Sequence, residues 1–377
     1  MKKILFISTR SPYSGRYSGD VIGSKKIIDI LKKNNIIDVV SLGKKENLEK
    51  KNIYIFKSPF LLAKIFYVIK SFLTLRPFHF GLFFSSKMKE FIDEKACNYD
   101  LIFFYHIRSS QYLPKNYKGK KIIEMGDLYS SNYKQTFQRL NILNPLKYIY
   151  FFEGLLVKKM EENIFTNFDK IILFSKNEIK RINKKFLKKT THINLSIQKI
   201  NKKYSFSKNN KKILFIGNLK YLPNIIAVKD FIKKALPKLE KEIPGVKFQI
   251  IGDINFIDKI LLNLNKNVKC VGVQKNLNKF IKGTFCGLAN LDIATGVQGK
   301  ILTYMSYGVP VICSKKVASN FSQNVMSYKN YQQFVEKILV LNRDKKLSNL
   351  MSKKSLSFVN NFKWNKVARS YLKLIKS

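Results

Sequence analysis

The hydrophobic pattern gives the chain two halves that begin alike. The run KKILFI occupies residues 2–7 and recurs unchanged at residues 211–216. A short apolar run is typical of a strand buried in a parallel sheet, and each copy is followed by a turn with Gly or Ser and by a helical pattern. Two such starts predict two similar α/β domains, each beginning with its central strand.

Strand-like and helix-like patterns alternate through both halves. Helical periodicity is clear over residues 22–33 and 148–167. The βαβ order predicts parallel, doubly wound sheets with helices on both faces. Ligands of such sheets bind beyond the carboxyl ends of the strands, and two facing domains would enclose a cleft. The predicted strands cover residues 4–7, 37–42, 52–56, 100–105, 121–125 and 170–174 in the first half, and 212–216, 247–251, 268–271, 287–289 and 309–313 in the second.

Candidate chemistry is densest in the second half. Gly217 ends a predicted strand, where the lack of a side chain lets the backbone approach a ligand. Asn224 is expected to cap a helix that runs to about Leu239. The stretch TGVQGK at residues 295–300 places two glycines before another helix, so backbone amides and the Lys300 ammonium can surround an anion. A departing diphosphate is the kind of anion that such donors stabilise.

These segments together resemble the carboxy-terminal domain of the GT-B glycosyltransferases, in particular the retaining bacterial enzymes called glycosyl transferases group 1 (glycosyltransferase family 4). The resemblance extends over about residues 211–377 and is looser in the first half. Matching pieces occur in the family's order at residues 213–224, 236–237, 244–252, 271–273, 277–281, 296–310 and 362–374.

The resemblance implies a domain organisation. It predicts two Rossmann-like, doubly wound α/β domains that face a central cleft. An acceptor-side domain would cover residues 1–200, together with a C-terminal helix at 363–377 that crosses back to it. A nucleotide-sugar donor domain would cover residues 201–362, and the polar segment at 198–210 would be the linker.

The resemblance also implies roles for individual residues. Lys300 would bind the donor diphosphate, and the other donor-side residues would be Gly217, Asn218, Lys220, Gly296, Val297, Gln298, Gly299 and Thr303. In the first half, strand ends carry the candidate catalytic residues His106, Arg108 and Asp127, while Gly19 and Asp20 lie in a glycine-containing turn on the acceptor side.

Two positions depart from the family's pattern. The family usually carries two Glu separated by seven residues, which would fall at Thr295 and Thr303, and the second normally holds the nucleotide ribose. A basic residue common after the first glycine is Asn218 here, so Lys220 is expected to supply that charge. The implied reaction is metal-independent, retaining transfer of a hexosyl group from a nucleotide-diphosphate sugar to a hydroxyl. Asp127 would be the base if the configuration inverted.

Composition narrows the partners and the compartment. The net charge is +47, yet only eight of the 71 basic residues are Arg, and Lys is spread along the whole chain. Base-reading proteins depend on Arg, so we expect no nucleic-acid partner, whereas an anionic membrane surface remains compatible with this charge. Four Cys without paired spacing and three distant His fit a reducing cytosol, with no metal site and no cofactor.

Residues 60–84 form the most apolar segment, but Lys64, Lys70, Arg76 and Pro77 interrupt it, so it is not expected to span a membrane. Core helices with basic exposed faces would explain the pattern, and so would a surface that dips into a membrane interface. We therefore expect a cytoplasmic protein, with peripheral attachment to the inner face of the cytoplasmic membrane as an open alternative. The resemblance implies a lipid-linked or glycan acceptor in bacterial lipopolysaccharide, capsule or exopolysaccharide synthesis.

Three other interpretations remain. An eroded transferase of the same fold that only binds nucleotide sugars or glycans would account for the missing Glu pair. A nucleic-acid-binding protein is supported by charge alone and lacks helix-turn-helix, aromatic-platform and zinc signatures. An epimerase on the same two-domain fold fits the pattern at residues 295–310 less well than a transferase does.

Overall fold

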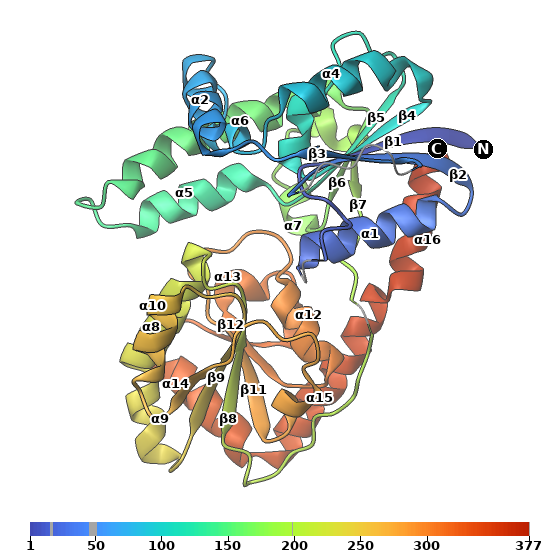
Figure 1. Ribbon diagram of the computed structural model, residues 1–377. Helices are drawn as coiled ribbons and strands as arrows, with labels where there is room; N and C mark the ends of the chain where they lie inside the picture. Colours follow the sequence, from blue (N-terminus) through green and yellow to red (C-terminus); the bar gives the residue numbers. More distant parts are fainter. Residues whose placement is uncertain (16–17, 45–50, 198, 377) are drawn as a thin grey trace. The chain divides into compact units, whose positions relative to one another are not determined.

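The computed structural model describes residues 1–15, 18–44, 51–197 and 199–376 (Figure 1). By its internal contacts the chain divides into unit 1, Met1–Ile193 with Ala368–Ser377, and unit 2, Asn194–Val367. Gln198, where the predicted linker begins, and Ser377, at the end of the predicted terminal helix, lie outside the described residues.

Unit 1 is built on a seven-stranded sheet in the order β3-β2-β1-β4-β5-β6-β7, and every neighbouring pair is parallel. The strand order reverses between β1 and β4, which is where doubly wound sheets place their ligands. The strands are β1 (Lys2–Ser8), β2 (Asn35–Gly43), β3 (Ile53–Lys57), β4 (Leu101–Tyr105), β5 (Lys120–Gly126), β6 (Lys170–Leu173) and β7 (Thr190–His192).

The end of the last helix belongs to unit 1. The buried Tyr371 of α16 (Trp364–Lys376) donates its hydroxyl to the Glu124 carboxylate of β5, and the Lys2 ammonium donates to the carbonyl of Ile375 at 2.8 Å. These contacts attach the end of the C-terminal helix to strands β1 and β5. The other helices of unit 1 are α1 (Gly19–Leu31), α2 (Leu61–Leu73), α3 (Phe78–Gly81), α4 (Ser86–Lys95), α5 (Tyr129–Arg139), α6 (Leu146–Asn167) and α7 (Lys176–Ile179), with 3-10 turns at Ala96–Asn98, Ile107–Tyr112 and Lys184–Lys189.

Unit 2 repeats the plan with a six-stranded parallel sheet in the order β10-β9-β8-β11-β12-β13. Its strands are β8 (Lys212–Ile216), β9 (Lys247–Ile251), β10 (Val268–Cys270), β11 (Thr284–Ala289), β12 (Val311–Ser314) and β13 (Met326–Tyr328). Its helices are α8 (Leu222–Lys234), α9 (Leu236–Glu242), α10 (Phe256–Asn263), α11 (Asn278–Ile281), α12 (Gly299–Ser306), α13 (Lys315–Ala318), α14 (Tyr331–Arg343) and α15 (Lys345–Val359), with 3-10 turns at Ser322–Asn324 and Asn360–Phe362.

The predicted fold class, two doubly wound α/β domains, is confirmed, and a strand forms at each of the eleven predicted runs. Sequence reasoning missed β7 and β13, which are three-residue strands at sheet edges without an apolar run. The single helix predicted as far as Leu239 is wrong. It breaks at Ala235, because Pro237 has no amide hydrogen to continue the ladder.

The apolar segment at residues 60–84 is mostly exposed. In α2 only Ser71 is buried, whereas Leu62, Phe66 and Ile69 expose 70%, 60% and 54% of their surface. The core-helix interpretation therefore holds for the short α3, whose Phe80 is buried, and is wrong for α2. Among the described residues no helix is both long and apolar enough to cross a bilayer.

Candidate functional site

Two side chains, those of Lys300 and Asn224, meet the backbone of the loop that follows β8. The Lys300 ammonium donates to the Asn224 side-chain oxygen at 2.6 Å and lies 4.1 Å from the centre of the Phe215 ring. The Asn224 amide nitrogen in turn donates to the carbonyl of Asn218 at 2.7 Å. A Cβ atom added to Gly217 would lie 3.1 Å from both the Lys300 nitrogen and the Asn224 amide nitrogen. The bare backbone at Gly217 therefore makes room for this lysine–amide pair.

Asn224 is a correction to the sequence prediction. It does not cap α8, whose N-cap is Tyr221, but lies buried in the first turn of the helix. Its side chain bridges the loop after β8 and the lysine from α12 instead. The residue type was noticed correctly, but sequence alone does not tell a capping amide from one that holds a charged neighbour.

A second glycine closes the backbone around this loop. Gly252, after β9, has φ of 155°, and a Cβ there would lie 1.7 Å from the carbonyl oxygen of Gly217. No other residue fits at that separation. The loop after β8 is thus fixed on one side by Gly252 and on the other by the Lys300–Asn224 pair.

The helix that carries Lys300 is held against the strand ends by a buried tyrosine. The Tyr304 hydroxyl accepts a hydrogen bond from the Ile216 amide at 2.6 Å and donates to the carbonyl of Leu288 at 3.1 Å. These bonds join α12 to β8 and β11. Because Tyr304 lies one turn after Lys300, it positions the lysine over the end of the sheet.

The ammonium of Lys300 is poorly solvated. Burial lowers the pKa of this group to about 7, and the neutral Asn224 oxygen is the hydrogen-bond acceptor that it has in the structure. α12 begins at Gly299, and the side chain of its N-cap residue Gln298 bonds no amide of the first turn. A lysine and a helix N-terminus together form a site suited to an anion.

The other donor-side candidates have different surroundings. Gln298 donates to the carbonyl of Thr295 at 2.8 Å and so closes the loop, and the carbonyl of Gly296 accepts from Asn320 at 2.7 Å. Val297 packs against the core of unit 2. The Thr303 hydroxyl donates into its own helix, to the carbonyl of Gly299 at 3.0 Å.

Lys220 lies on the surface of the loop. Its ammonium pairs with the Asp253 carboxylate at 3.0 Å, and both side chains are about half exposed. The Asn218 side-chain oxygen accepts from the Lys220 amide at 3.0 Å, which shapes the turn. The charge of Lys220 is therefore balanced by Asp253, while that of Lys300 has no acidic partner among the described residues.

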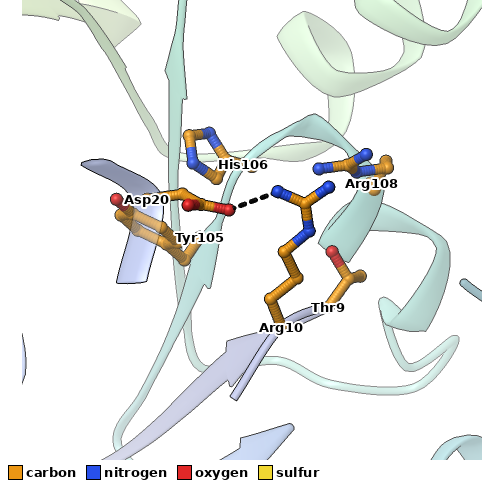
Figure 2. Close-up of a pocket in the computed structure, with 6 residues that line it drawn as sticks. All are labelled: Thr9, Arg10, Asp20, Tyr105, His106 and Arg108. Carbon is orange, nitrogen blue, oxygen red and sulfur yellow. Dashed lines mark hydrogen bonds and ion pairs between the residues drawn. The ribbon is translucent and has the colours of Figure 1, made fainter. Parts of the chain in front are cut away.

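A separate pocket in unit 1 gathers several first-half candidates. Its lining, shown in Figure 2, combines the end of β1, the start of α1 and the end of β4. Arg10 pairs with Asp20 at 2.6 Å, and nearby hydrogen-bond donors, Arg10 among them, outweigh the effect of burial and lower the pKa of Asp20 to about 2. The pocket is lined by Thr9, Arg10, Asp20, Tyr105, His106 and Arg108.

His106 has a strained backbone at this pocket. Its φ is 66°, uncommon for a residue with a side chain, and its amide donates to the carbonyl of Glu124 at 2.8 Å. The ring nitrogen Nδ1 is buried, with no hydrogen-bond partner among the described residues. Burial, and then the nearby Arg108 charge, lower the pKa of His106 to about 4, so the ring is neutral at physiological pH.

Two other first-half candidates lie outside the lining of this pocket. Gly19 begins α1 next to Asp20, and Asp127 follows β5. Burial raises the pKa of Asp127 to about 7, and its Oδ1 has no partner among the described residues. Sequence reasoning missed Arg10. Arg10 lies just after β1, as His106 lies just after β4. Polar residues at strand ends were the signal that indicated His106, and the same signal would have indicated Arg10.

Two doubly wound parallel α/β units are the architecture of the GT-B fold. Residues 210–344 match the family model described as Glycosyl transferases group 1. This match agrees with the family resemblance that the sequence indicated for the second half of the chain.

Solved structures match the whole length of the chain. TarM has a TM-score of 0.68 at 13% identity, with 100% of this chain and 99% of that chain covered. HepE from Anabaena in complex with UDP and glucose has a TM-score of 0.66 at 14% identity, with both chains fully covered. WaaG, a glycosyltransferase involved in lipopolysaccharide biosynthesis, has a TM-score of 0.66 at 11% identity, with 99% of each chain covered.

One curated protein also matches. It is an uncharacterized 44.6 kDa protein in the cps region of Klebsiella pneumoniae, 24% identical over 262 residues. The match covers 67% of this chain and spans 65% of the length of that relative.

Proposed function

We propose that this protein transfers a sugar from a nucleotide-diphosphate sugar to a hydroxyl of an acceptor. The observation that carries the proposal is the convergence of Lys300, Asn224 and the bare backbone of Gly217 at the start of α12. A buried ammonium with a neutral partner, next to backbone amides, is suited to the diphosphate that leaves during transfer. Gly296, Val297, Gln298 and Gly299 would line the sugar and phosphates.

The leaving group dictates the main catalytic requirement. As the bond to the sugar breaks, negative charge grows on the departing phosphate, and Lys300 with the α12 amides would stabilise it without a metal. In a retaining reaction the leaving phosphate itself takes the acceptor proton. In an inverting reaction Asp127 is the base, and a pKa of about 7 suits that role.

The donor proposed is a UDP-hexose. Support comes from the fold shared with HepE, which was solved with UDP-glucose. Thr303 stands where the family usually has the glutamate that binds the ribose, and its hydroxyl donates to a carbonyl of its own helix. We therefore expect other groups to bind the ribose. We expect Asn218 and Lys220, in the loop after β8, to take part in donor binding.

The acceptor proposed is a lipid-linked or glycan hydroxyl in bacterial surface polysaccharide synthesis. Support comes from the likeness to WaaG, which is involved in lipopolysaccharide biosynthesis, and to the protein of the cps region of Klebsiella pneumoniae. His106, Arg108 and Asp20, with Gly19 beside them, would form the acceptor side.

A peripheral position at an anionic membrane face fits this acceptor. Exposed apolar side chains lie along α2 and along the loop and the first half of α6 in the α5–α6 hairpin, and Figure 1 shows α2 and this hairpin in the same part of unit 1. The two are joined, because Glu153 of α6 accepts from the amides of Phe78 and His79, and the Phe78 ring lies 5.5 Å from that of Phe72 in α2.

The charge of this apolar surface supports a lipid partner. Residues 51–89 and 128–152, which contain it, include seven and three basic residues but no Asp or Glu. Apolar side chains flanked by Lys and Arg favour the interface of a bilayer with anionic lipids. We therefore propose that α2 and the α5–α6 hairpin attach the protein to the inner face of the cytoplasmic membrane.

A screen of nucleotide sugars tests the proposed activity. Each donor is added to the full chain, thermal stabilisation is recorded, and stabilising donors are incubated with membrane-extracted lipid acceptors and analysed by mass spectrometry. We expect at least one UDP-hexose to stabilise the protein and to be consumed. Stabilisation without turnover would favour the eroded binding protein, and stabilisation by no nucleotide sugar would refute the proposal.

A further inference from the structure

Arg108 carries a charge that the protein does not balance. The guanidinium is largely withdrawn from solvent, and burial lowers its pKa. Its contact is with the ring of Phe83, whose centre lies 4.2 Å away, and no hydrogen bond or ion pair to Arg108 exists among the described residues. Withdrawing an arginine from water without a carboxylate of its own is unfavourable, so the site is incomplete as it stands.

The neighbours of Arg108 do not remove this imbalance. Arg10 lies on the same ring, 5.7 Å from its centre, but its charge is matched by Asp20 at 2.6 Å. His106 stays neutral at physiological pH because of burial and the nearby arginine. Two guanidinium groups and one carboxylate leave the pocket with one net positive charge.

The donors of these groups point into a common space. Figure 2 shows the guanidinium groups of Arg10 and Arg108 next to each other at the pocket, with the His106 ring beside them. The pocket is partly open to solvent, so an anion can approach it from outside. Planar guanidinium groups bind carboxylate and phosphate oxygens through paired hydrogen bonds.

We propose that the pocket of Arg10, Asp20, His106 and Arg108 binds an anionic group, a phosphate or a carboxylate, carried by the acceptor. The assignment to the acceptor rests on the proposed glycosyl transfer, whereas the affinity of the pocket for the anion does not. Arg108 donates to the anion, Arg10 shares its remaining donors with it, and Phe83 holds both planes in place. The acceptor is thus a charged glycan or a phosphorylated lipid, and not a neutral sugar.

A set of matched ligands shows which anionic group the pocket binds and whether the sugar that carries it contributes. Lys300→Gln protein is used, so that the anion site of unit 2 does not contribute. Calorimetric titration with glucose 6-phosphate, glucuronate, inorganic phosphate and glucose compares a phosphate on a sugar, a carboxylate on a sugar, the free anion and the neutral sugar. We expect glucose 6-phosphate or glucuronate to bind and glucose not to bind. Binding of neither, or equal binding of glucose, would overturn the proposal.

Variants assign the binding to Arg108. In the same background, Arg108→Gln is expected to raise the Kd for the bound anion about tenfold or more, because a charge-assisted bidentate contact is lost, and Arg108→Lys to lie between the two. Arg181→Gln, an exposed arginine of the same unit, is the control and should bind as its parent does. Equal affinity in parent and Arg108→Gln would refute the assignment.

The melting temperature is a second readout. A binding role and a purely structural role of Arg108 predict opposite changes in it when Arg108 is replaced. Without ligand, Arg108→Met is expected to raise the melting temperature, because an unbalanced charge leaves the interior. A lowered melting temperature would mean that Arg108 serves the fold. If the anion binds through Arg108 while no nucleotide sugar binds the native protein, the anion site is supported and the proposed glycosyl transfer is refuted. If a nucleotide sugar binds while no anion binds through Arg108, only the anion site is refuted.

Discussion

The first strands of the two units, β1 and β8, share the same six-residue run, but they end in opposite ways. After KKILFI, unit 1 continues with Ser8, Thr9 and Arg10, and unit 2 with Gly217, Asn218 and Leu219. In unit 1 the first strand delivers a charged side chain, which pairs with Asp20. In unit 2 it delivers bare backbone, over which Lys300 from a distant helix lies.

Under the proposed function, this difference would let one fold bind two different substrates. A strand end with side chains selects a ligand by charge and shape, whereas a strand end with glycine and a helix start binds phosphate through backbone amides and one ammonium. The six-residue run is the same in both units, so we propose that the residues after it decide which ligand is bound. The predictions below test the comparison from the largest expected effect to the smallest.

Lys300→Gln removes the charge from the unit 2 site. We expect donor turnover to fall by about 100-fold or more, because one positioned group at a developing charge is typically worth that much. Turnover is measured as UDP release with the donor found in the screen. Lys241→Gln, an exposed lysine of α9, serves as the control and is expected to keep full activity. Equal rates for Lys300→Gln and the native protein would remove the donor-site assignment.

Exchanging the strand ends tests the role of the bare backbone. In Gly217→Ser the added atoms meet Lys300 and Asn224, so we expect a loss of about 10- to 100-fold in turnover through misplacement of the ammonium. The mirror change Ser8→Gly leaves unit 2 untouched, and its UDP affinity should equal that of the native protein. If Gly217→Ser turns over the donor normally, the close approach at Gly217 has no functional role.

The lowered pKa of Lys300 makes stability depend on pH. Between about pH 7 and the ordinary lysine pKa near 10.4, the unfolded state holds a proton that the folded state lacks, so the free energy of unfolding rises with pH. The slope from this group is at most about 1.4 kcal/mol per pH unit. Denaturant unfolding at pH 6 to 10 checks it, and Lys300→Gln should show a shallower rise. Parallel curves for both proteins would show that Lys300 has an ordinary pKa.

The exposed apolar surface of unit 1 is expected to bind lipid. The double variant Phe66→Ser with Ile69→Ser should lower binding to vesicles with anionic lipid by about 10-fold, since two apolar side chains no longer leave water. Vesicle flotation measures the bound fraction. The matched control is Ile257→Ser with Ile260→Ser on α10, which exposes similar side chains in unit 2 but carries Asp258 between them. An equal loss in the control would refute a docking role specific to α2.

The sequence predicted the fold well because parallel strands leave a strong trace. Runs such as residues 213–215 and 101–104 are buried on both faces, so every position is apolar. The edge strands β7 and β13 are only partly buried, so they carry no apolar run that would have predicted them. Lys300 and Gly217 could be proposed from the sequence because a glycine at a strand end and glycines before a helix are local patterns.

The rest of the site depends on contacts between distant segments. Asn224 was mistaken for a helix cap, since only the fold shows its bond to a lysine 76 positions later. The unbalanced charge of Arg108 arises because the acid of its pocket, Asp20, is paired with Arg10, which no local pattern reveals. The exposure of α2 was equally hidden, because an apolar run does not say whether another element covers it.

Titration of UDP into the native protein and Lys300→Gln at pH 8 tests the donor site most directly. Calorimetry in two buffers of different ionisation heat gives both the affinity and the protons exchanged. The native protein should take up protons on binding, because the diphosphate raises the pKa of Lys300 from about 7. Lys300→Gln should bind at least about tenfold more weakly and take up no proton at this site. Equal affinity and equal proton uptake in the two proteins would contradict the account.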